Sequence, residues 1–183
     1  MAGLPGDPVV FGLEDCAVYQ MTDATSEPET YASKVDVPGI RRLGVTVNFD
    51  PTEELRGDNT VLAVAGGKIN SVSLDVENAI LDIEAMAVIF PSAVSSGGST
   101  PNEEKKITFA TDEDAGYFKI VGHADLPDSG NVLVTIYKCR AGGATISFGD
   151  NTFAIPGFTI RGVENNAHDI IDFHLYETET AIS

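Results

Sequence analysis

Apolar and polar residues alternate along much of this chain, most clearly over residues 68–77. The apolar positions are Val72, Leu74 and Val76, and the polar positions between them are Ser71, Ser73, Asp75 and Glu77. A period of two predicts a strand with one face in the core and the other turned away from it. Residues 40–50 alternate in the same way, so we expect a second strand of this kind there.

Further segments with the composition of strands follow at regular intervals, separated by turn residues. These candidates are residues 15–21, 34–37, 61–65, 106–111, 117–124, 131–140, 145–148, 153–162 and 170–178. The polar residues 51–60 predict an exposed loop, and the Gly- and Ser-rich residues 91–106 predict a flexible connection. The pattern predicts a mainly β fold, a β-sandwich or barrel. We expect residues 1–33 to form an N-terminal arm and first strand, and residues 34–183 to form a single β domain.

The period changes from two to that of a helix only once. Over residues 79–89, Ile80, Ile83 and Ala87 recur at helical spacing, and a proline follows. Asn78 can cap the first turn. We therefore expect one flanking helix, about residues 79–89, that packs on the β core through these three apolar side chains.

The charge balance limits the classes of partner. The chain has 183 residues, of which 28 are acidic and 11 are basic, so its net charge is −17. This excess argues against nucleic-acid binding by phosphate neutralisation and against docking on an anionic membrane. No signal peptide and no membrane insertion are expected. Cys16 and Cys139 have no metal or redox spacing, and we expect both to be unpaired thiols in a protein made in the cytosol.

The familiar catalytic and nucleotide-binding motifs are missing from the sequence. Even spacing places His168, Asp172 and His174 on one face of a predicted strand, where a metal site is a remote alternative to a plain polar surface. The adjacent carboxylates at 53–54 and at 103–104 point to opposite faces of an extended chain and form no acid–base pair. We therefore expect no catalytic residue, no metal and no cofactor, and we do not expect an enzyme.

Six segments, taken in their order and spacing, resemble a known protein family. They are residues 53–64, 68–89 (KINSVSLDVENAILDIEAMAVI), 99–109 (STPNEEKKITF), 117–124 (YFKIVGHA), 131–163 and 169–182. Together they resemble the major tail tube proteins of siphophages over roughly residues 34–182. The matching motifs are structural.

The resemblance implies a β-sandwich or barrel flanked by a helix, similar to the type VI secretion tube protein. Subunits of this family form hexameric rings that stack into a tube, and their inner sheets complete one barrel across the subunits. Double-stranded DNA passes through the channel during infection without specific binding. The implied partners are further copies of the chain, a tape measure protein inside the tube, the tail terminator, and the baseplate or tip proteins. The implied location is the tail of the virion, with assembly in the host cytoplasm.

The resemblance also implies that the exposed loop at residues 51–60 contacts the next ring. The candidate ring-stacking residues are Glu53, Glu54, Arg56, Gly57, Asp58 and Asn59. We expect an acidic channel wall, because a basic wall would hold DNA and stall its passage. The candidate channel-lining residues are Asp50, Asp75, Glu77, Glu113 and Asp114. The alternative is that these carboxylates lie on the outer surface and serve solubility.

Two other functions stay open. One is a tail terminator or completion protein, which would form a single ring. The other is a β-sandwich binding module, for carbohydrate or for capsid decoration. A carbohydrate module commonly uses exposed tryptophan or tyrosine platforms, and the chain has no tryptophan.

Overall fold

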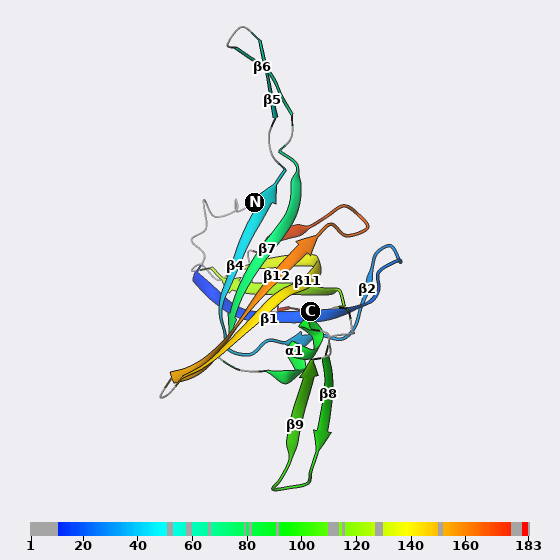
Figure 1. Ribbon diagram of the computed structural model, residues 1–183, viewed down its shortest axis with the longest axis vertical. Helices are drawn as coiled ribbons and strands as arrows, with labels where there is room; N and C mark the ends of the chain where they lie inside the picture. Colours follow the sequence, from blue (N-terminus) through cyan, green and yellow to red (C-terminus); the bar gives the residue numbers. More distant parts are fainter. Residues whose placement is uncertain are drawn as a thin grey trace.

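In the computed structural model, the chain is described over residues 11–50, 53–57, 60–65, 67–78, 80, 82–90, 92–109, 114, 116–126, 130–149, 152–176 and 181–182. The elements in chain order are β1 (Phe11–Asp23), β2 (Thr30–Tyr31), β3 (Val35–Asp36), β4 (Ile40–Phe49), β5 (Glu53–Gly57), β6 (Thr60–Ala65), β7 (Ile69–Asn78), α1 (Ile83–Ile89), β8 (Ser92–Gly97), β9 (Glu104–Phe109), β10 (Phe118–Asp125), β11 (Asn131–Gly149), β12 (Thr152–Val163) and β13 (Ile171–Tyr176) (Figure 1). The prediction of a mainly β sandwich is confirmed.

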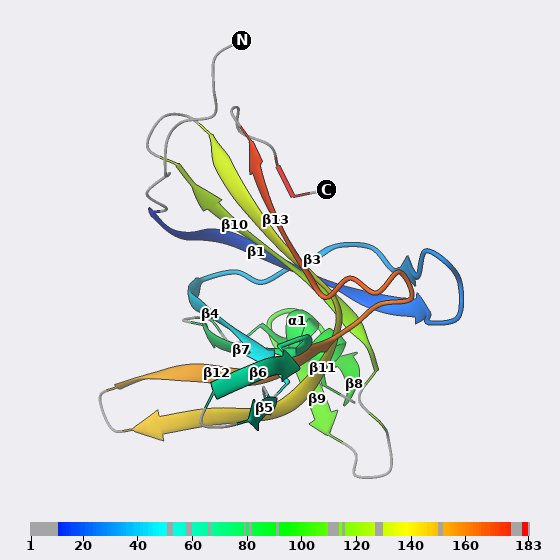
Figure 2. The same ribbon diagram turned by 90° about the horizontal axis from the view of Figure 1, so that it is seen from above.

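The largest sheet is antiparallel and runs in the order β2–β1–β10–β11–β12–β7–β4, with β3 paired to β1 and β13 paired to β11. The first part of β11 pairs with β10 and β13, and its second part, from Lys138 onward, pairs with β12. The sheet therefore folds over β11 into two layers (Figure 2). We call β1, β10, β13 and the first part of β11 the β1 layer. The second part of β11 with β12, β7 and β4 forms the β4 layer.

Strand β11 corrects one sequence prediction. Residues 131–140 and 145–148 were expected to be two strands, but they belong to one strand of 19 residues. The pairing with β12 shifts register between Ala141 and Gly143, which marks a bulge. Glycines at such a position let a strand bend while its ladder continues. The glycine pair that resembles a turn in sequence is therefore a bend inside one strand.

The hydrophobic core lies between the two layers. Its members from the β4 layer include Val72, Leu74, Val76, Phe158 and Ile160, and those from the β1 layer include Cys16, Val18, Phe118, Ile120 and Ile136. The alternation predicted over residues 68–77 is confirmed, because its apolar side chains are buried here while Asp75 and Glu77 are exposed. Burial of these aliphatic side chains, each worth roughly 1.5–3 kcal/mol, holds the layers together.

The first strand is part of this sandwich. β1 pairs with β10 along most of its length and also with β3. Cys16 is a fully buried free thiol on β1, and Cys139 on β11 is another. Burial raises the pKa of Cys16 to about 12, with a smaller effect from the Asp15 carboxylate, and burial also raises the pKa of Cys139. Of the predicted arm and first strand at residues 1–33, residues 1–10 lie outside the described residues.

The helix begins later than the sequence predicts. Asp82 is its N-cap, since Asp82 Oδ1 accepts hydrogen bonds from the backbone N–H groups of Glu84 (2.7 Å) and Ala85 (3.4 Å). Asn78, the expected cap, is the last residue of β7. The strand thus continues to Asn78, and the helix starts only where a carboxylate can satisfy its first N–H groups.

The buried face of the helix also differs from the predicted one. The buried residues of α1 are Ala85, Met86 and Ile89. The predicted stripe is wrong: Ile80 precedes the helix and is 49% exposed, while Ile83 and Ala87 are only partly buried. The expectation that the helix packs on the β core is confirmed, because its three buried residues belong to the main core cluster.

Each of two segments expected to lack strands forms a hairpin with a segment predicted to be a strand, residues 61–65 for β6 and residues 106–111 for β9. Strand β5 lies within the predicted loop 51–60 and pairs with β6, from Glu53 opposite Ala65 to Gly57 opposite Thr60. Strands β8 and β9 pair over the whole of β8, within the predicted connection 91–106 and just beyond it. The polar composition of β5 and β8 gives no strand signal, whereas β9 contacts the core through Ile107. The hairpins lie at opposite ends of the long axis of the molecule (Figure 1).

Candidate functional site

The β4 layer has two open edges. β4 pairs with β7 on one side, and no described strand pairs with its other side. At the opposite border, β10 pairs with β11 only as far as Cys139. Beyond this point, no strand among the described residues covers that side of β11. Exposed strand edges present unpaired N–H and C=O groups, which favour pairing with another chain.

Where its side chains are described, the face of the β4 layer that points away from the core is polar and built mostly of short side chains. Across the strands, Thr46 lies opposite Ser73 and Gly44 opposite Asp75. On the other side of β7, Asp75 lies opposite Thr159. Asn48 Nδ2 donates to Ser73 Oγ at 2.9 Å and so joins β4 to β7 on this face. The face is thus a flat polar surface between two open edges.

The two best-placed channel candidates lie on this polar face. Asp75 and Glu77 are both exposed there, in register with Gly44 and Arg42 of β4. Arg42 Nη1 is 4.0 Å from Glu77 Oε1 in an exposed ion pair. Exposed pairs of this kind contribute little to stability.

Of the other channel candidates, Asp114 lies beside the polar face, Asp50 lies at the end of β4, and Glu113 cannot be placed. Asp50 follows the end of β4, where its Oδ1 accepts a hydrogen bond from Asn70 Nδ2 at 2.7 Å. The Asp114 side chain is fully exposed and lies 3.8 Å from Arg140 Nη2. Glu113 lies outside the described residues.

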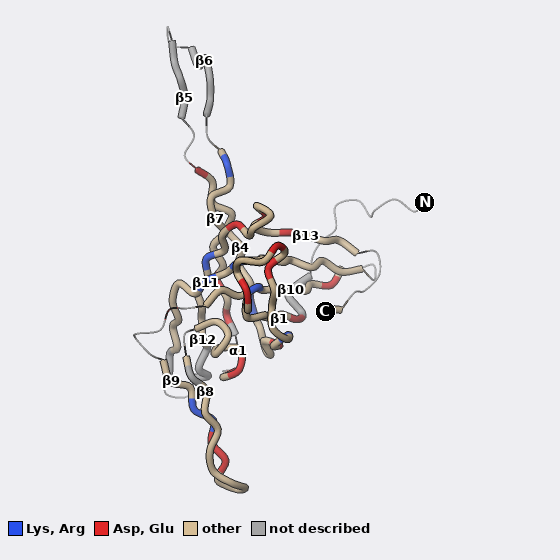
Figure 3. The backbone as a smooth tube through the Cα atoms, turned by 90° about the vertical axis from the view of Figure 1, so that its right-hand side faces the viewer, with Lys and Arg blue, Asp and Glu red and all other residues tan. Residues whose placement is uncertain are grey.

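Basic residues share the polar face, a feature that the sequence prediction missed. Arg140 lies directly opposite Arg161, and Arg161 lies opposite Ser73. The Arg140 guanidinium stands over the Tyr117 ring at 5.4 Å, and Lys138 Nζ stands over the same ring at 5.1 Å. Acidic and basic positions are interspersed over the strands (Figure 3). The strand register, once known, would have revealed this mixture of charges.

The candidate ring-stacking residues lie on a strand rather than on an irregular loop. Glu53, Glu54, Arg56 and Gly57 belong to β5. Asp58 and Asn59 lie outside the described residues. The backbone N–H of Asp50 donates to the Lys68 carbonyl at 2.8 Å, between the β4–β7 pairing and the β5–β6 pairing. The β5–β6 hairpin therefore extends the β4–β7 hairpin beyond the sheet.

Sequence reasoning also missed two exposed apolar pairs at the hairpins. Phe49 lies directly opposite Ile69, at the base of the β5–β6 hairpin. Val94 and Phe109 are exposed on the β8–β9 hairpin. Phe49 and Phe109 lie in segments predicted to be strands, and the sequence pattern does not show that both side chains are exposed.

His168, Asp172 and His174 do not lie together on one strand face, although their even spacing in the sequence suggests it. His168 lies in a turn with φ 67° and not on the strand that carries Asp172 and His174. Asp172 instead accepts a hydrogen bond from the Tyr137 hydroxyl, and His174 Nε2 is 3.7 Å from Asp172 Oδ2. Within the described part of the chain, no three His, Cys, Asp or Glu side chains are grouped to hold a metal ion.

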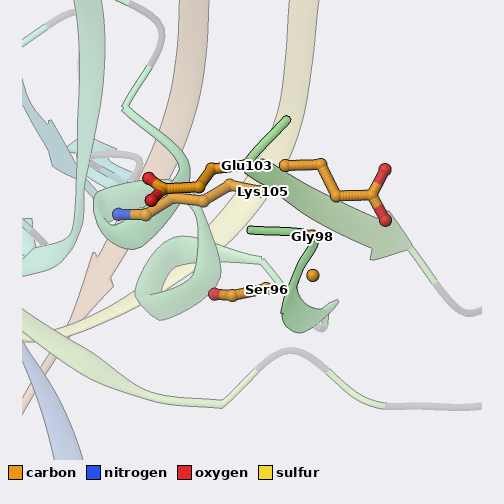
Figure 4. A pocket seen from close by; sticks show the side chains of 6 residues that line it. Ser96, Gly98, Glu103 and Lys105 are labelled. Atoms are coloured by element: carbon orange, nitrogen blue, oxygen red, sulfur yellow. The ribbon is translucent and has the colours of Figure 1, made fainter. Parts of the chain in front are cut away.

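A hollow of about 350 Å³ lies at the tip of the β8–β9 hairpin, and its lining residues include Ser96, Gly98, Glu103 and Lys105 (Figure 4). Gly98 has φ 79°, and a Cβ atom there would collide with the Asn102 carbonyl. Lys105 Nζ pairs with Glu84 Oε1 at 2.6 Å, which joins the hairpin to α1. The hollow is open, and its charged residues are exposed. It therefore has the character of a surface dip beside a hairpin turn.

Comparison with known proteins gives no family assignment, since the chain matches no family model and no curated protein. No described helix has the length and apolar character needed to cross a membrane.

Proposed function

We propose that the chain is the structural subunit of a phage tail tube, in which rings of subunits stack and enclose a channel for double-stranded DNA. One observation carries the proposal: the β4 layer combines two open edges with a polar, solvent-facing surface between them. A lone domain gains nothing from two open edges, whereas a ring subunit uses both. The sequence resemblance to siphophage tail tube proteins supports the same function.

The position of the two edges is compatible with closure into a ring. The free edge of β4 and the free edge of β11 beyond Cys139 lie on opposite borders of one layer. When β4 of one copy pairs with β11 of the next, each copy uses two different surfaces. Such a head-to-tail contact closes into a ring when the rotation per copy divides a full turn.

The dimensions of such a ring suit a DNA channel. The β4 layer contributes four strands, so six copies give about 24 strands. With roughly 4.8 Å between strands and a tilt of about 40°, these strands close a barrel roughly 45–50 Å across at the backbone. The polar face has mostly short side chains, so most of this opening stays free for a duplex.

The polar face supplies the channel wall in this proposal. Asp75 and Glu77 repel DNA, as the sequence analysis expects, but Arg42, Arg140 and Arg161 share the wall with them. A wall of both signs has no continuous basic surface to hold the phosphates, and its short-range fields are screened over about 8 Å in physiological salt. DNA would pass without specific binding.

The remaining partners follow from the family resemblance. A tape measure protein would occupy the channel during assembly, and terminator and baseplate or tip proteins would cover the two ends of the tube. The protein would act in the tail of the virion after assembly in the host cytoplasm. No catalytic group is needed for any of these roles.

Electron microscopy of the purified, concentrated protein tests the proposal. Filaments of uniform width with a central channel are expected. Single rings that never stack would favour a terminator or completion protein. Monodisperse monomers under all conditions, including incubation with tail tips or seeds of assembled tube, would contradict the proposal and favour a β-sandwich binding module.

A further inference from the structure

Two pairs of exposed apolar side chains lie at the hairpins on opposite ends of the molecule. Phe49 and Ile69, which we call the upper patch, are 60% and 47% exposed at the base of the β5–β6 hairpin. Val94 and Phe109, which we call the lower patch, are 40% and 50% exposed on the β8–β9 hairpin. Large side chains this exposed at specific places commonly mark contact surfaces.

Both patches are held in position by neighbouring structure. Phe49 and Ile69 are cross-strand partners, and the hydrogen bond between Asp50 and Lys68 closes the ladder beside them. The Phe109 ring meets the Phe90 ring edge-on at 5.9 Å, and Phe90 in turn contacts the core ring of Phe158 at 5.5 Å. A partner would therefore meet preformed surfaces, which lowers the entropic cost of docking.

We propose that the upper patch of one copy docks on the lower patch of a second copy in the next ring. This inference rests on the proposed function, and it adds the receiving surface and the residues of the stacking contact. The hairpins that bear the patches point to opposite ends of the long axis (Figure 1). One copy cannot join its own two patches, so the contact repeats head-to-tail and produces an open stack.

The size of the patches explains why rings, and not single subunits, would stack. The two half-exposed side chains of each patch offer an apolar area on the order of 150 Å². A stable pair of proteins usually needs about 800 Å² on each partner. One contact is therefore too small to hold two free subunits together. Rings present several contacts at once, and each one formed raises the effective concentration for the others.

The charges beside the patches favour the head-to-tail arrangement. Residues 50–68, which lead into and out of the β5–β6 hairpin, contain four acidic and two basic residues. Lys106 on β9 is exposed and lies closer to the lower patch than the acidic residues at the hairpin tip, while Lys105 is already paired with Glu84. Docking the upper end of one copy on the lower end of the next brings the acidic segment near Lys106. Docking two upper ends would bring like charges together.

Disulfide trapping tests this contact. The variant carries Phe49→Cys together with Val94→Cys, and its assemblies are oxidised and run on a denaturing, non-reducing gel. The native Cys16 and Cys139 are fully buried and do not interfere. We expect a ladder of covalent dimers, trimers and longer chains, because each copy donates one upper and one lower cysteine. Either single-cysteine variant should give no ladder.

A matched control replaces the upper position by an equally exposed residue elsewhere. Phe173 on β13 is 57% exposed and belongs to neither patch. The pair Phe173→Cys with Val94→Cys should therefore give no ladder. A second variant, Phe49→Ser with Ile69→Ser, should still form rings by electron microscopy but should form no tubes.

The outcomes separate this inference from the proposed function. Tubes that form without cross-links, or tubes that form normally from the serine variant, would overturn the stacking contact and leave the tube subunit standing. Covalent dimers without longer chains would indicate a symmetric contact and would also overturn it. If the wild-type chain forms neither rings nor tubes, the proposed function itself fails, and the stacking contact falls with it.

Discussion

Arg140 and Arg161 lie directly opposite each other on β11 and β12, on the polar face of the β4 layer. Like charges in direct cross-strand contact destabilise a sheet. Here the Tyr117 ring lies beneath the Arg140 guanidinium, and the Asp114 carboxylate lies 3.8 Å from it. These neighbours offset part of the repulsion, so the pair persists on a face that also carries Asp75 and Glu77.

Removing one charge of this pair is expected to stabilise the folded chain. Arg161→Gln should raise the free energy of unfolding by about 0.2–1 kcal/mol at low ionic strength, because the cross-strand repulsion is lost. The gain should shrink in 1 M salt, where charges are screened over about 3 Å. Urea unfolding at the two salt concentrations measures it. Arg42→Gln is the control, since Arg42 faces the carboxylate of Glu77 and its loss should give no gain.

Reversing the acidic charges of the polar face is expected to impair DNA passage. In Asp75→Lys with Glu77→Lys, the face becomes uniformly basic beside Arg140 and Arg161, and a basic wall holds phosphates. Tails should form, but the rate of DNA ejection should fall sharply. Isosteric Asp75→Asn with Glu77→Gln removes the charge without reversing it and should have a weaker effect. Normal ejection from the lysine variant would place this face outside the channel.

The buried face of α1 leads to a prediction about stability. Met86 is buried against the core, so Met86→Ala should lower the free energy of unfolding by about 2–5 kcal/mol. Ile80 is 49% exposed and lies before the helix, so Ile80→Ala should cost less than half of that loss. Chemical unfolding followed by circular dichroism compares the two. Equal losses would contradict this buried face and would favour the one predicted from the sequence pattern.

The buried thiols predict how stability changes with pH. Burial raises the pKa of Cys16 from 9.0 to about 12 and raises the pKa of Cys139 as well. Thiols of the unfolded chain ionise near pH 9, while those of the folded chain keep their protons. Their contribution to stability is thus complete below about pH 9 and is lost as the pH rises towards 12.

Unfolding midpoints measured from pH 7 to 12 check this effect. The wild type should lose more stability above pH 9 than Cys16→Ser with Cys139→Ser, which lacks both thiols. In the folded wild type, a thiol reagent at pH 8 should label neither cysteine, because both thiols are fully buried and burial raises their pKa well above 8. Rapid labelling of the folded protein would show that the thiols are accessible.

Much of the sandwich could be predicted from the sequence, because its strands have one buried and one exposed face. The alternation of Val72, Leu74 and Val76 gives both the strand and its orientation. The helix was misplaced because Ile80 and Ile83 have helical spacing, yet the start of the helix is set by a local cap at Asp82. Capping depends on backbone geometry that apolar spacing does not report.

The hairpins and the charges of the polar face could not be predicted for a different reason. Strand β8 places no described side chain in the core and β9 contacts it through Ile107, so burial does not impose a full period of two on this hairpin. Arg140, Arg161 and Asp75 come from three strands far apart in sequence, and only the register brings them onto one face. The register between strands that are far apart in sequence is non-local, and the local pattern of a single sequence does not predict it.

The central claim is that the open edge of β4 pairs with the open edge of β11 in the neighbouring copy. Backbone amide hydrogen exchange, compared between free subunits and assembled rings or tubes, tests it most directly. Peptides covering residues 41–49 and 140–149 should become strongly protected on assembly, because their edge N–H groups gain partners. A peptide covering residues 153–162 is the internal control, since β12 already pairs with β11 and β7 on its two sides and should change little. Assemblies in which residues 41–49 and 140–149 exchange as fast as in the free subunit would contradict the account.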